Sequence, residues 1–101
     1  MLEREKVAVL FIDVQGKLAD VMAEKDVLFR NIGKLLKGAG VLGLPVLCTE
    51  QIPGKLGPTR SEFAQYLQET DPIAKSTFSC CGEPRFMEAL ADCGRKQIVL
   101  C

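Results

Sequence analysis

The sequence contains no histidine and no tryptophan, and its 13 basic and 13 acidic side chains give a formal net charge of zero. The absence of histidine excludes a Ser-His or Cys-His relay within the chain, and a zinc site that uses imidazole. The balanced charge disfavours a nucleic-acid partner, because such proteins normally carry a basic stripe. Any catalysis within this chain must therefore use Asp, Glu, Lys, Cys, Ser or Tyr side chains.

Long apolar runs are also missing. Residues 1–6 carry charges of both signs, and the apolar run that follows has only six residues, too few for a membrane span or a signal-peptide core. We therefore expect a cytoplasmic protein with no membrane partner. The 101 residues fit one domain, and 48% hydrophobic with 26% charged residues is typical of a globular chain.

The five cysteines form no C-x-x-C pair, and their number is odd. This pattern disfavours a disulfide framework and a zinc ribbon. We expect Cys48, Cys93 and Cys101 to be small buried hydrophobic side chains. Cys80 and Cys81 lie in a loop-like segment and should remain free thiols. We predict neither a metal site nor a cofactor.

The order of apolar runs and turn signals predicts alternating strands and helices. Strands are expected at 7–12, 45–49, 73–75 and 97–101, and helices at 26–39, 61–67 and 84–93. We expect Asp26 and Ser61 to cap the starts of the first two helices. Gly38 and Gly40 should end the first helix, and Pro84 should open the last one. Such alternation is typical of an α/β domain with a parallel sheet and right-handed crossovers.

Residues 38–43 match the G-x-G-x-x-G pattern of dinucleotide-binding loops. The pattern here closes a helix and precedes a strand, whereas the dinucleotide fingerprint follows a strand and opens a helix. We therefore interpret these glycines as helix termination and a turn.

Polar residues follow the first two predicted strands. Asp13 directly follows the first strand, and residues 49–51 (Thr-Glu-Gln) follow the second. Ligands of open α/β sheets bind at the carboxyl ends of the strands. Asp13 is therefore a candidate catalytic carboxylate and Gln51 a candidate substrate-binding residue, with a capped turn and a polar loop as the simpler alternatives. Lys75 on its own would be a solvated surface charge, or the activating group of a Ser-Lys pair with a following hydroxyl.

Five segments, taken in order, resemble the isochorismatase-like cysteine hydrolases, the group that includes nicotinamidases and related amidases. Residues 7–15 resemble the first-strand motif of that family. Residues 46–51, 56–59 and 75–80 are similar to the small isochorismatase-domain proteins, and 98–101 resemble the strand that leads into the family's nucleophile loop. The resemblance spans essentially the whole chain.

The resemblance implies a three-layer α/β/α, Rossmann-like fold with a six-stranded parallel sheet. Residues 1–101 would supply about four of these strands, as the N-terminal portion of an isochorismatase-like domain that is incomplete at its C-terminus. It also implies a Cys-Asp-Lys triad that hydrolyses a C–N bond of a small amide, with Asp13 as general base and Lys75 as the triad lysine. The family's cysteine lies beyond the last strand, so we do not assign Cys101 as the nucleophile and expect no triad-dependent activity from this chain alone.

A second hypothesis is a non-catalytic isochorismatase-like domain that acts through protein–protein association. A parallel strand without a covering helix exposes unpaired backbone groups and apolar surface, both of which favour association. We therefore expect a homo-oligomer, in addition to a small-molecule amide substrate for the full-length parent.

Overall fold

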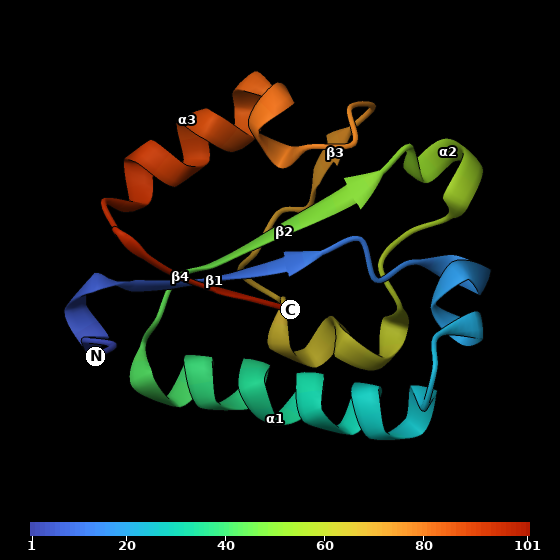
Figure 1. The fold of residues 1–101 in the computed structure, drawn as a ribbon, viewed down its shortest axis with the longest axis horizontal. Coiled ribbons are helices and arrows are strands. Elements are labelled where there is room, and N and C mark those ends of the chain that lie inside the picture. The colour runs from blue at the N-terminus through green and yellow to red at the C-terminus, as the bar shows by residue number, and fades with distance from the viewer.

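The computed structural model describes all residues, 1–101, and contains a four-stranded parallel sheet between helices (Figure 1). The strands are β1 (Val7–Ile12), β2 (Val46–Gln51), β3 (Ile73–Lys75) and β4 (Gln97–Leu100). Their order in the sheet is β3-β2-β1-β4. The chain thus builds outward from β1 on one side and then crosses to the other side for β4, which confirms the predicted α/β class.

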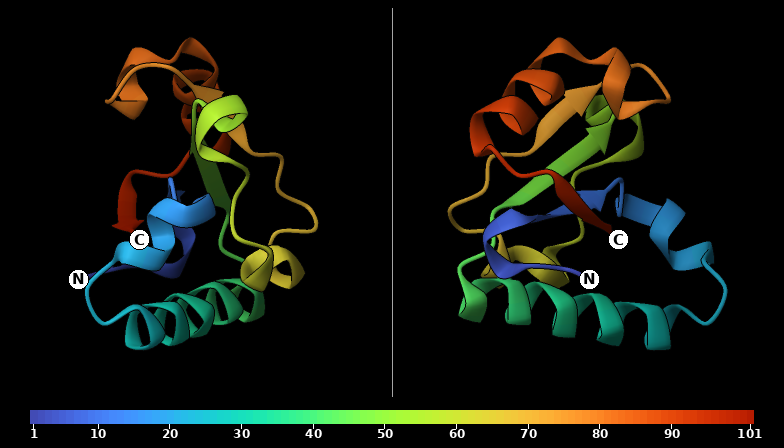
Figure 2. Two further views of the ribbon diagram at one scale, coloured as in Figure 1. Left: turned by 90° about the vertical axis from the view of Figure 1, so that its right-hand side faces the viewer. Right: turned by 60° about the vertical axis from the view of Figure 1, so that its left-hand side comes forward.

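Helices cover both faces of the sheet. The helices are α1 (Lys25–Leu42), α2 (Pro53–Leu56) and α3 (Pro84–Cys93), joined by short 3-10 helices η1 (Arg4–Lys6), η2 (Gly16–Val21), η3 (Ser61–Tyr66) and η4 (Cys80–Gly82). Both views of Figure 2 place α1 on one side of the strands and α3 on the other, so the fold has three layers. None of the helices combines the length and the apolar character needed to cross a membrane.

Strand β1 divides the hydrophobic core into two clusters, one on each face of the sheet. The strand is buried on both faces, as its apolar run predicts. Side chains at alternate positions of a strand point to opposite faces of the sheet. The larger cluster lies on the α1 face and comprises Val9, Phe11, Ile32, Leu36, Ala39, Cys48 and Phe63. The smaller cluster lies on the α3 face and comprises Leu10, Ile73 and Phe86. We call these two sides the α1 face and the α3 face.

Helix α1 extends past the predicted range 26–39 at both ends. Gly38 and Gly40 lie inside it, and the helix ends at Gly43, which has a φ of 68° and donates its N–H to carbonyls of the last turn. A glycine inside a helix lowers stability by only about 1 kcal/mol. The packing of the buried α1 side chains on the sheet contributes more than this. Asp26 lies within the first turn and Glu24 holds the cap position without a side-chain bond, so the predicted Asp26 cap is wrong.

Strand β2 also runs further than predicted, through Gln51, because β3 pairs with its end in the register Gln51↔Lys75. Ser61 is the first residue of η3 rather than its cap, and Arg60 precedes it without a capping side chain. The start of α3 at Pro84 is confirmed. Strand β4 begins at the predicted Gln97 and pairs with β1, but it ends at Leu100, one residue before the predicted end at Cys101.

Candidate functional site

The carboxyl ends of three strands bring Asp13 and Lys75 together, 62 positions apart in the sequence. Lys75 Nζ donates to Asp13 Oδ2 at 2.9 Å, and Thr49 Oγ1 donates to Asp13 Oδ1 at 2.8 Å. One oxygen of the carboxylate therefore accepts a hydrogen bond from the adjacent strand β2, and the other accepts one from β3, the strand beyond it. This fixes the orientation of the Asp13 side chain at the edge of the sheet.

The backbone of Asp13 turns sharply as β1 ends. Its φ is 54°, in the left-handed region that aspartate and asparagine tolerate better than most other side chains. Its N–H still donates to the carbonyl of Thr49 at 3.2 Å, so the turn remains attached to β2. The residue type at position 13 thus suits the backbone geometry as well as the chemistry.

The two members of the pair differ in exposure. The Lys75 side chain is 0% exposed and the Asp13 side chain 24% exposed. Lys75 Nζ is also within hydrogen-bond distance of Gln51 Oε1 at 2.6 Å, Phe78 O at 3.1 Å and Thr77 O at 3.3 Å. The interpretation of Lys75 as a solvated surface charge is therefore wrong, and Asp13 is the member that an incoming molecule can reach.

The fully buried side chain of Gln15 bonds to the backbone next to this site. Gln15 Oε1 accepts from the N–H of Gln51 at 2.6 Å. Gln15 Nε2 donates to the carbonyl of Gln51 at 3.1 Å and to that of Gly57 at 2.8 Å. Gln15 therefore fixes the end of β2 and the loop after it, and through Gln51 it fixes the partner of Lys75. Its place two residues after Asp13 is the only signal in the sequence that pointed to it, and sequence reasoning missed this role.

Not every polar residue at the predicted edge joins the site. Thr49 and Gln51 lie on the α3 face, whereas Glu50 points to the α1 face, as alternation along β2 requires. There Glu50 Oε2 accepts from the N–H and the hydroxyl of Thr59, at 2.6 and 2.8 Å. In the loop after β3, Lys75 bonds backbone carbonyls and no hydroxyl, so a Ser-Lys pair is not formed.

All five cysteines are free. Cys48 is buried as predicted, but Cys93 and Cys101 are only half-buried, as is Cys80, and Cys81 is exposed. Cys48 belongs to the core of the α1 face and Cys101 packs against it, on the opposite side of the sheet from Lys75. Burial raises the pKa of the Cys48 thiol, and burial beside Cys48 raises the pKa of Cys101 to about 11. Both thiols are protonated at neutral pH, which agrees with leaving Cys101 unassigned as a nucleophile.

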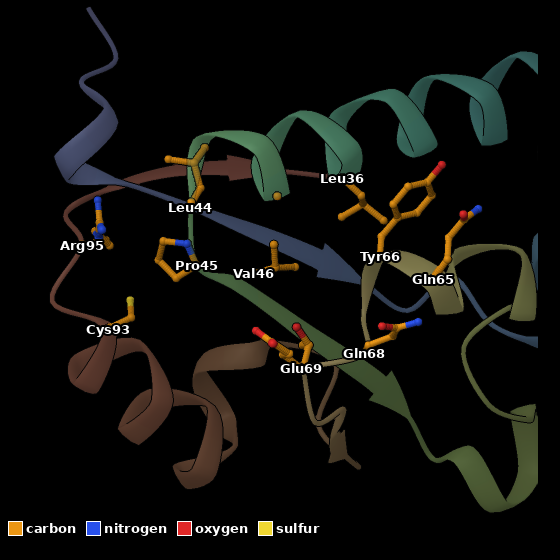
Figure 3. Close-up of a pocket in the computed structure, with 13 residues that line it drawn as sticks. Leu36, Leu44, Pro45, Val46, Gln65, Tyr66, Gln68, Glu69, Cys93 and Arg95 are labelled. Carbon is orange, nitrogen blue, oxygen red and sulfur yellow. The ribbon is translucent and has the colours of Figure 1, made fainter.

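A hollow of about 700 Å³ lies far from this site, near the amino ends of the strands (Figure 3). Leu44, Pro45 and Val46 at the start of β2 form one side, and Cys93 at the end of α3 and Arg95 after it form another. The residues that line it include neither Asp13 nor Lys75. No cluster of three or more cysteine, aspartate and glutamate side chains is arranged to hold a metal ion.

The chain is similar to solved structures of about twice its length. One is the YcaC gene product of Escherichia coli, described as an octameric hydrolase of unknown specificity. The match includes 98% of this chain and 50% of the Escherichia chain, with a TM-score of 0.87 and 25% sequence identity. Another is YcaC from Pseudomonas aeruginosa, solved with hexane-2,5-diol and covalent acrylamide. The TM-score is 0.83 and the sequence identity 26%, and the match includes 98% of this chain and 51% of the Pseudomonas chain. For MAR1 ribonuclease from Caenorhabditis elegans the TM-score is 0.86 and the sequence identity 25%, and the match includes 98% of this chain and 50% of the ribonuclease chain.

A curated relative and a family description agree with these structures. The chain is 36% identical over 73 residues to isochorismatase domain-containing protein 2A of Mus musculus, a match that covers 71% of this chain and 34% of the mouse protein. The chain therefore spans about a third of the mouse protein and about half of the solved neighbours. A family model that describes the isochorismatase domain matches residues 7–101. This protein chain belongs to the isochorismatase domain family.

Proposed function

We propose that the chain supplies the aspartate and the lysine of a Cys-Asp-Lys hydrolase that cleaves the C–N bond of a small amide. The observation that carries this proposal is the Asp13–Lys75 pair, with a buried ammonium behind a carboxylate that remains partly exposed. We place the thiol in polypeptide outside residues 1–101, because the family pattern places its nucleophile beyond the last strand and assigns no role to Cys80 or Cys81, and because Cys48 and Cys101 lie on the other face of the sheet.

In this mechanism Asp13 acts as the general base. Its carboxylate takes the proton of the incoming thiol as the sulfur attacks the amide carbonyl carbon. The tetrahedral intermediate collapses to a thioester as the C–N bond breaks, and the proton leaves on ammonia or an amine. Water activated by the same carboxylate then hydrolyses the thioester, which releases the acid and restores the thiol.

Lys75 contributes charge and position. Its ammonium holds Asp13 Oδ2 at 2.9 Å and is shielded from solvent, so its field acts at low local dielectric. A positive charge beside the carboxylate favours both a thiolate and the negative charge that develops on the substrate oxygen. The side-chain amide oxygen of Gln51, Oε1, accepts a hydrogen bond from Lys75, and the assignment of Gln51 as a substrate-binding residue stays a prediction.

Properties printed for the neighbours support this proposal. The Pseudomonas protein holds covalent acrylamide, a small amide and an electrophile that captures nucleophilic side chains. The Escherichia protein is a hydrolase and an octamer, and we propose that this chain also acts in a homo-oligomer in the cytoplasm. The Caenorhabditis neighbour is a ribonuclease, whereas the zero net charge of this chain disfavours an RNA partner. These relatives give no support to a purely non-catalytic role.

The experiment compares the 101-residue chain with a hybrid in which it is joined to the half of the Escherichia YcaC protein that it does not cover. Ammonia release is measured with a panel of small primary amides. We expect turnover by the hybrid and none by the chain alone. Asp13→Asn should reduce the turnover of the hybrid by about 10²–10⁴-fold, the usual contribution of a general base.

Asp71→Asn is the matched control, because Asp71 is an exposed aspartate after η3 that forms no ion pair. It should leave turnover unchanged. Turnover by the 101-residue chain that survives Asp13→Asn would refute the proposed role of Asp13.

A further inference from the structure

Glu50 is a half-buried carboxylate that the proposed function does not use. It lies near the end of β2, directly before Gln51, and its side chain points to the α1 face. Its Oε2 atom accepts from the N–H of Thr59 at 2.6 Å and from the hydroxyl of Thr59 at 2.8 Å. These two bonds fix the carboxylate, and its Oε1 atom has no hydrogen-bond partner in the protein.

A cavity of about 270 Å³ lies beside this carboxylate, between the end of β2 and the segment that carries η3. Its walls include four apolar residues, Pro58, Ala64, Leu67 and Pro72. Thr70 also lines the cavity and adds a hydroxyl that no other side chain engages. The cavity thus combines apolar walls with a carboxylate and a hydroxyl.

Arg60 also lines the cavity, but its charge is already compensated. Its Nη1 atom donates to Asp20 at 2.8 Å and to the carbonyl of Gly16 at 2.9 Å. Its Nη2 and Nε atoms donate to Glu62 at 2.8 and 3.1 Å. Two carboxylates therefore surround this one guanidinium. Of the two charged residues that line the cavity, Glu50 is the one without an ion-pair partner.

An uncompensated negative charge beside apolar walls selects ligands of one kind. A carboxylate and a hydroxyl can both accept hydrogen bonds, and the charge favours a cationic donor. An ammonium group has three N–H donors and no acceptor, and apolar walls favour a hydrocarbon chain attached to it. We propose that this cavity binds a small aliphatic primary amine in its ammonium form, with the head group on Glu50 and Thr70 and the carbon chain against Leu67 and the two prolines.

This site is separate from the Asp13–Lys75 pair. Glu50 points to the α1 face, whereas its neighbour Gln51 points to the α3 face and accepts from Lys75. The inference therefore does not rest on amide hydrolysis, and it can be tested without any measurement of catalysis. The N–H of Thr59 provides the reporter, because it donates to the carboxylate that would receive the ammonium group.

The experiment titrates the 101-residue chain with n-butylammonium chloride at constant ionic strength and follows the Thr59 amide by NMR. Sodium butyrate and n-butanol serve as probes of the same chain length with the opposite charge and with no charge. We expect a saturable shift of the Thr59 amide with butylammonium and none with the other two. From methylammonium to butylammonium, the affinity should rise by about threefold to fourfold for each added methylene.

Glu50→Gln removes the charge and keeps a side-chain oxygen that can accept from Thr59. It should weaken the binding of butylammonium by about tenfold or more, the usual scale for a hydrogen bond to a charged group. Glu88→Gln is the matched control, because Glu88 is an exposed glutamate on α3, on the other side of the sheet. It should leave the affinity unchanged.

Ala64→Leu tests the apolar part of the cavity. Ala64 is an exposed residue of η3 that lines the cavity, so a larger side chain there should fill hydrocarbon space without disturbing the core. Butylammonium should bind about tenfold more weakly, the equivalent of roughly two methylenes, while methylammonium binds as before. Equal weakening of both amines would contradict the placement of the carbon chain in this cavity.

Three further results would overturn the proposed site. The first is the absence of a saturable shift of the Thr59 amide with any of the amines. The second is a shift of equal size with butyrate or butanol, which would show that the cavity does not select a cation. The third is equal weakening by Glu50→Gln and Glu88→Gln, which would assign the binding to the general charge of the surface.

Discussion

Lys75 and Asp13 form an ion pair of 2.9 Å in which the lysine side chain is fully buried and the aspartate side chain is 24% exposed. The ammonium has four acceptors around it, two of them side-chain oxygens, Asp13 Oδ2 and Gln51 Oε1, and two of them backbone carbonyls. The buried Lys75 therefore joins the end of β1, the end of β2 and the loop after β3. We expect the loss of the lysine charge and the loss of the aspartate charge to lower the free energy of unfolding by different amounts.

Lys75→Met should lower the free energy of unfolding by about 3–5 kcal/mol, because it leaves several buried acceptors without a donor. Asp13→Asn should cost less, since the asparagine keeps one side-chain oxygen as an acceptor and Lys75 keeps its three other acceptors. The double variant should be less destabilised than the sum of the two, because the residues share one interaction. Urea denaturation measures all three, with the exposed Lys37→Met on α1 as control. Equal losses for Lys75→Met and Lys37→Met would show that the pair contributes no stability.

Gln15→Leu tests the glutamine below the site. The change keeps the approximate size of the side chain but leaves the N–H and carbonyl of Gln51 without their partner. An unpaired buried backbone group costs about 1–3 kcal/mol, so the free energy of unfolding should fall by that amount and the urea midpoint should move to lower concentration. Gln68→Leu, at an exposed glutamine after η3, is the matched control and should have little effect. If both variants unfold together, Gln15 does not support β2.

The sequence predicts much of this fold because its local signals agree with the tertiary structure. The apolar run of β1 required burial on both faces, and Pro84 and Gly94 sit at the two ends of α3 as their backbone preferences dictate. Helix α1 shows the limit. Gly38 and Gly40 are stop signals by propensity, but the packing of Leu36 and Ala39 on the sheet carries the helix through to Gly43.

The site was predicted less completely, because burial and facing direction depend on strand register. Asp13 at a strand end was evident from the pattern. The burial of Lys75 follows from its pairing opposite Gln51, which no local pattern indicates. Glu50 differs from its neighbours Thr49 and Gln51 only in the face to which it points. The support from Gln15 depends on the path of the α2 loop, whose Gly57 carbonyl it binds.

Phe78 and Phe86 provide a comparison of exposed and buried aromatic side chains near the site. Phe78 is 99% exposed although Lys75 holds its backbone carbonyl, and Phe86 is 2% exposed in the core of the α3 face. Phe86→Ala should cost about 3–5 kcal/mol of unfolding free energy, whereas Phe78→Ala should change it by less than about 0.5 kcal/mol. Thermal unfolding of the two variants measures this difference. A large loss for Phe78→Ala would mean that its ring is covered in solution.

The thiol of Cys101 should react slowly at pH 8 and much faster as the pH rises. Its pKa is raised to about 11 from an ordinary value of 9.0, mainly by burial. Its thiolate fraction at pH 8 is then about 100-fold lower than that of an unperturbed thiol. Alkylation with iodoacetamide, located by mass spectrometry, should modify the exposed Cys81 first, and unfolding in urea should remove the difference.

The same shift predicts the sign of a stability change. Between pH 9 and about 11 the unfolded thiol loses its proton while the native thiol keeps it, so the native state loses stability as the pH rises through this window. Below pH 9 both states are protonated and Cys101 contributes no slope. Cys101→Ser should therefore flatten the fall in urea midpoint above pH 9, whereas Cys81→Ser should leave it unchanged. Native Cys101 that is alkylated at pH 8 as fast as Cys81 would contradict the raised pKa and reopen its assignment as a reactive thiol.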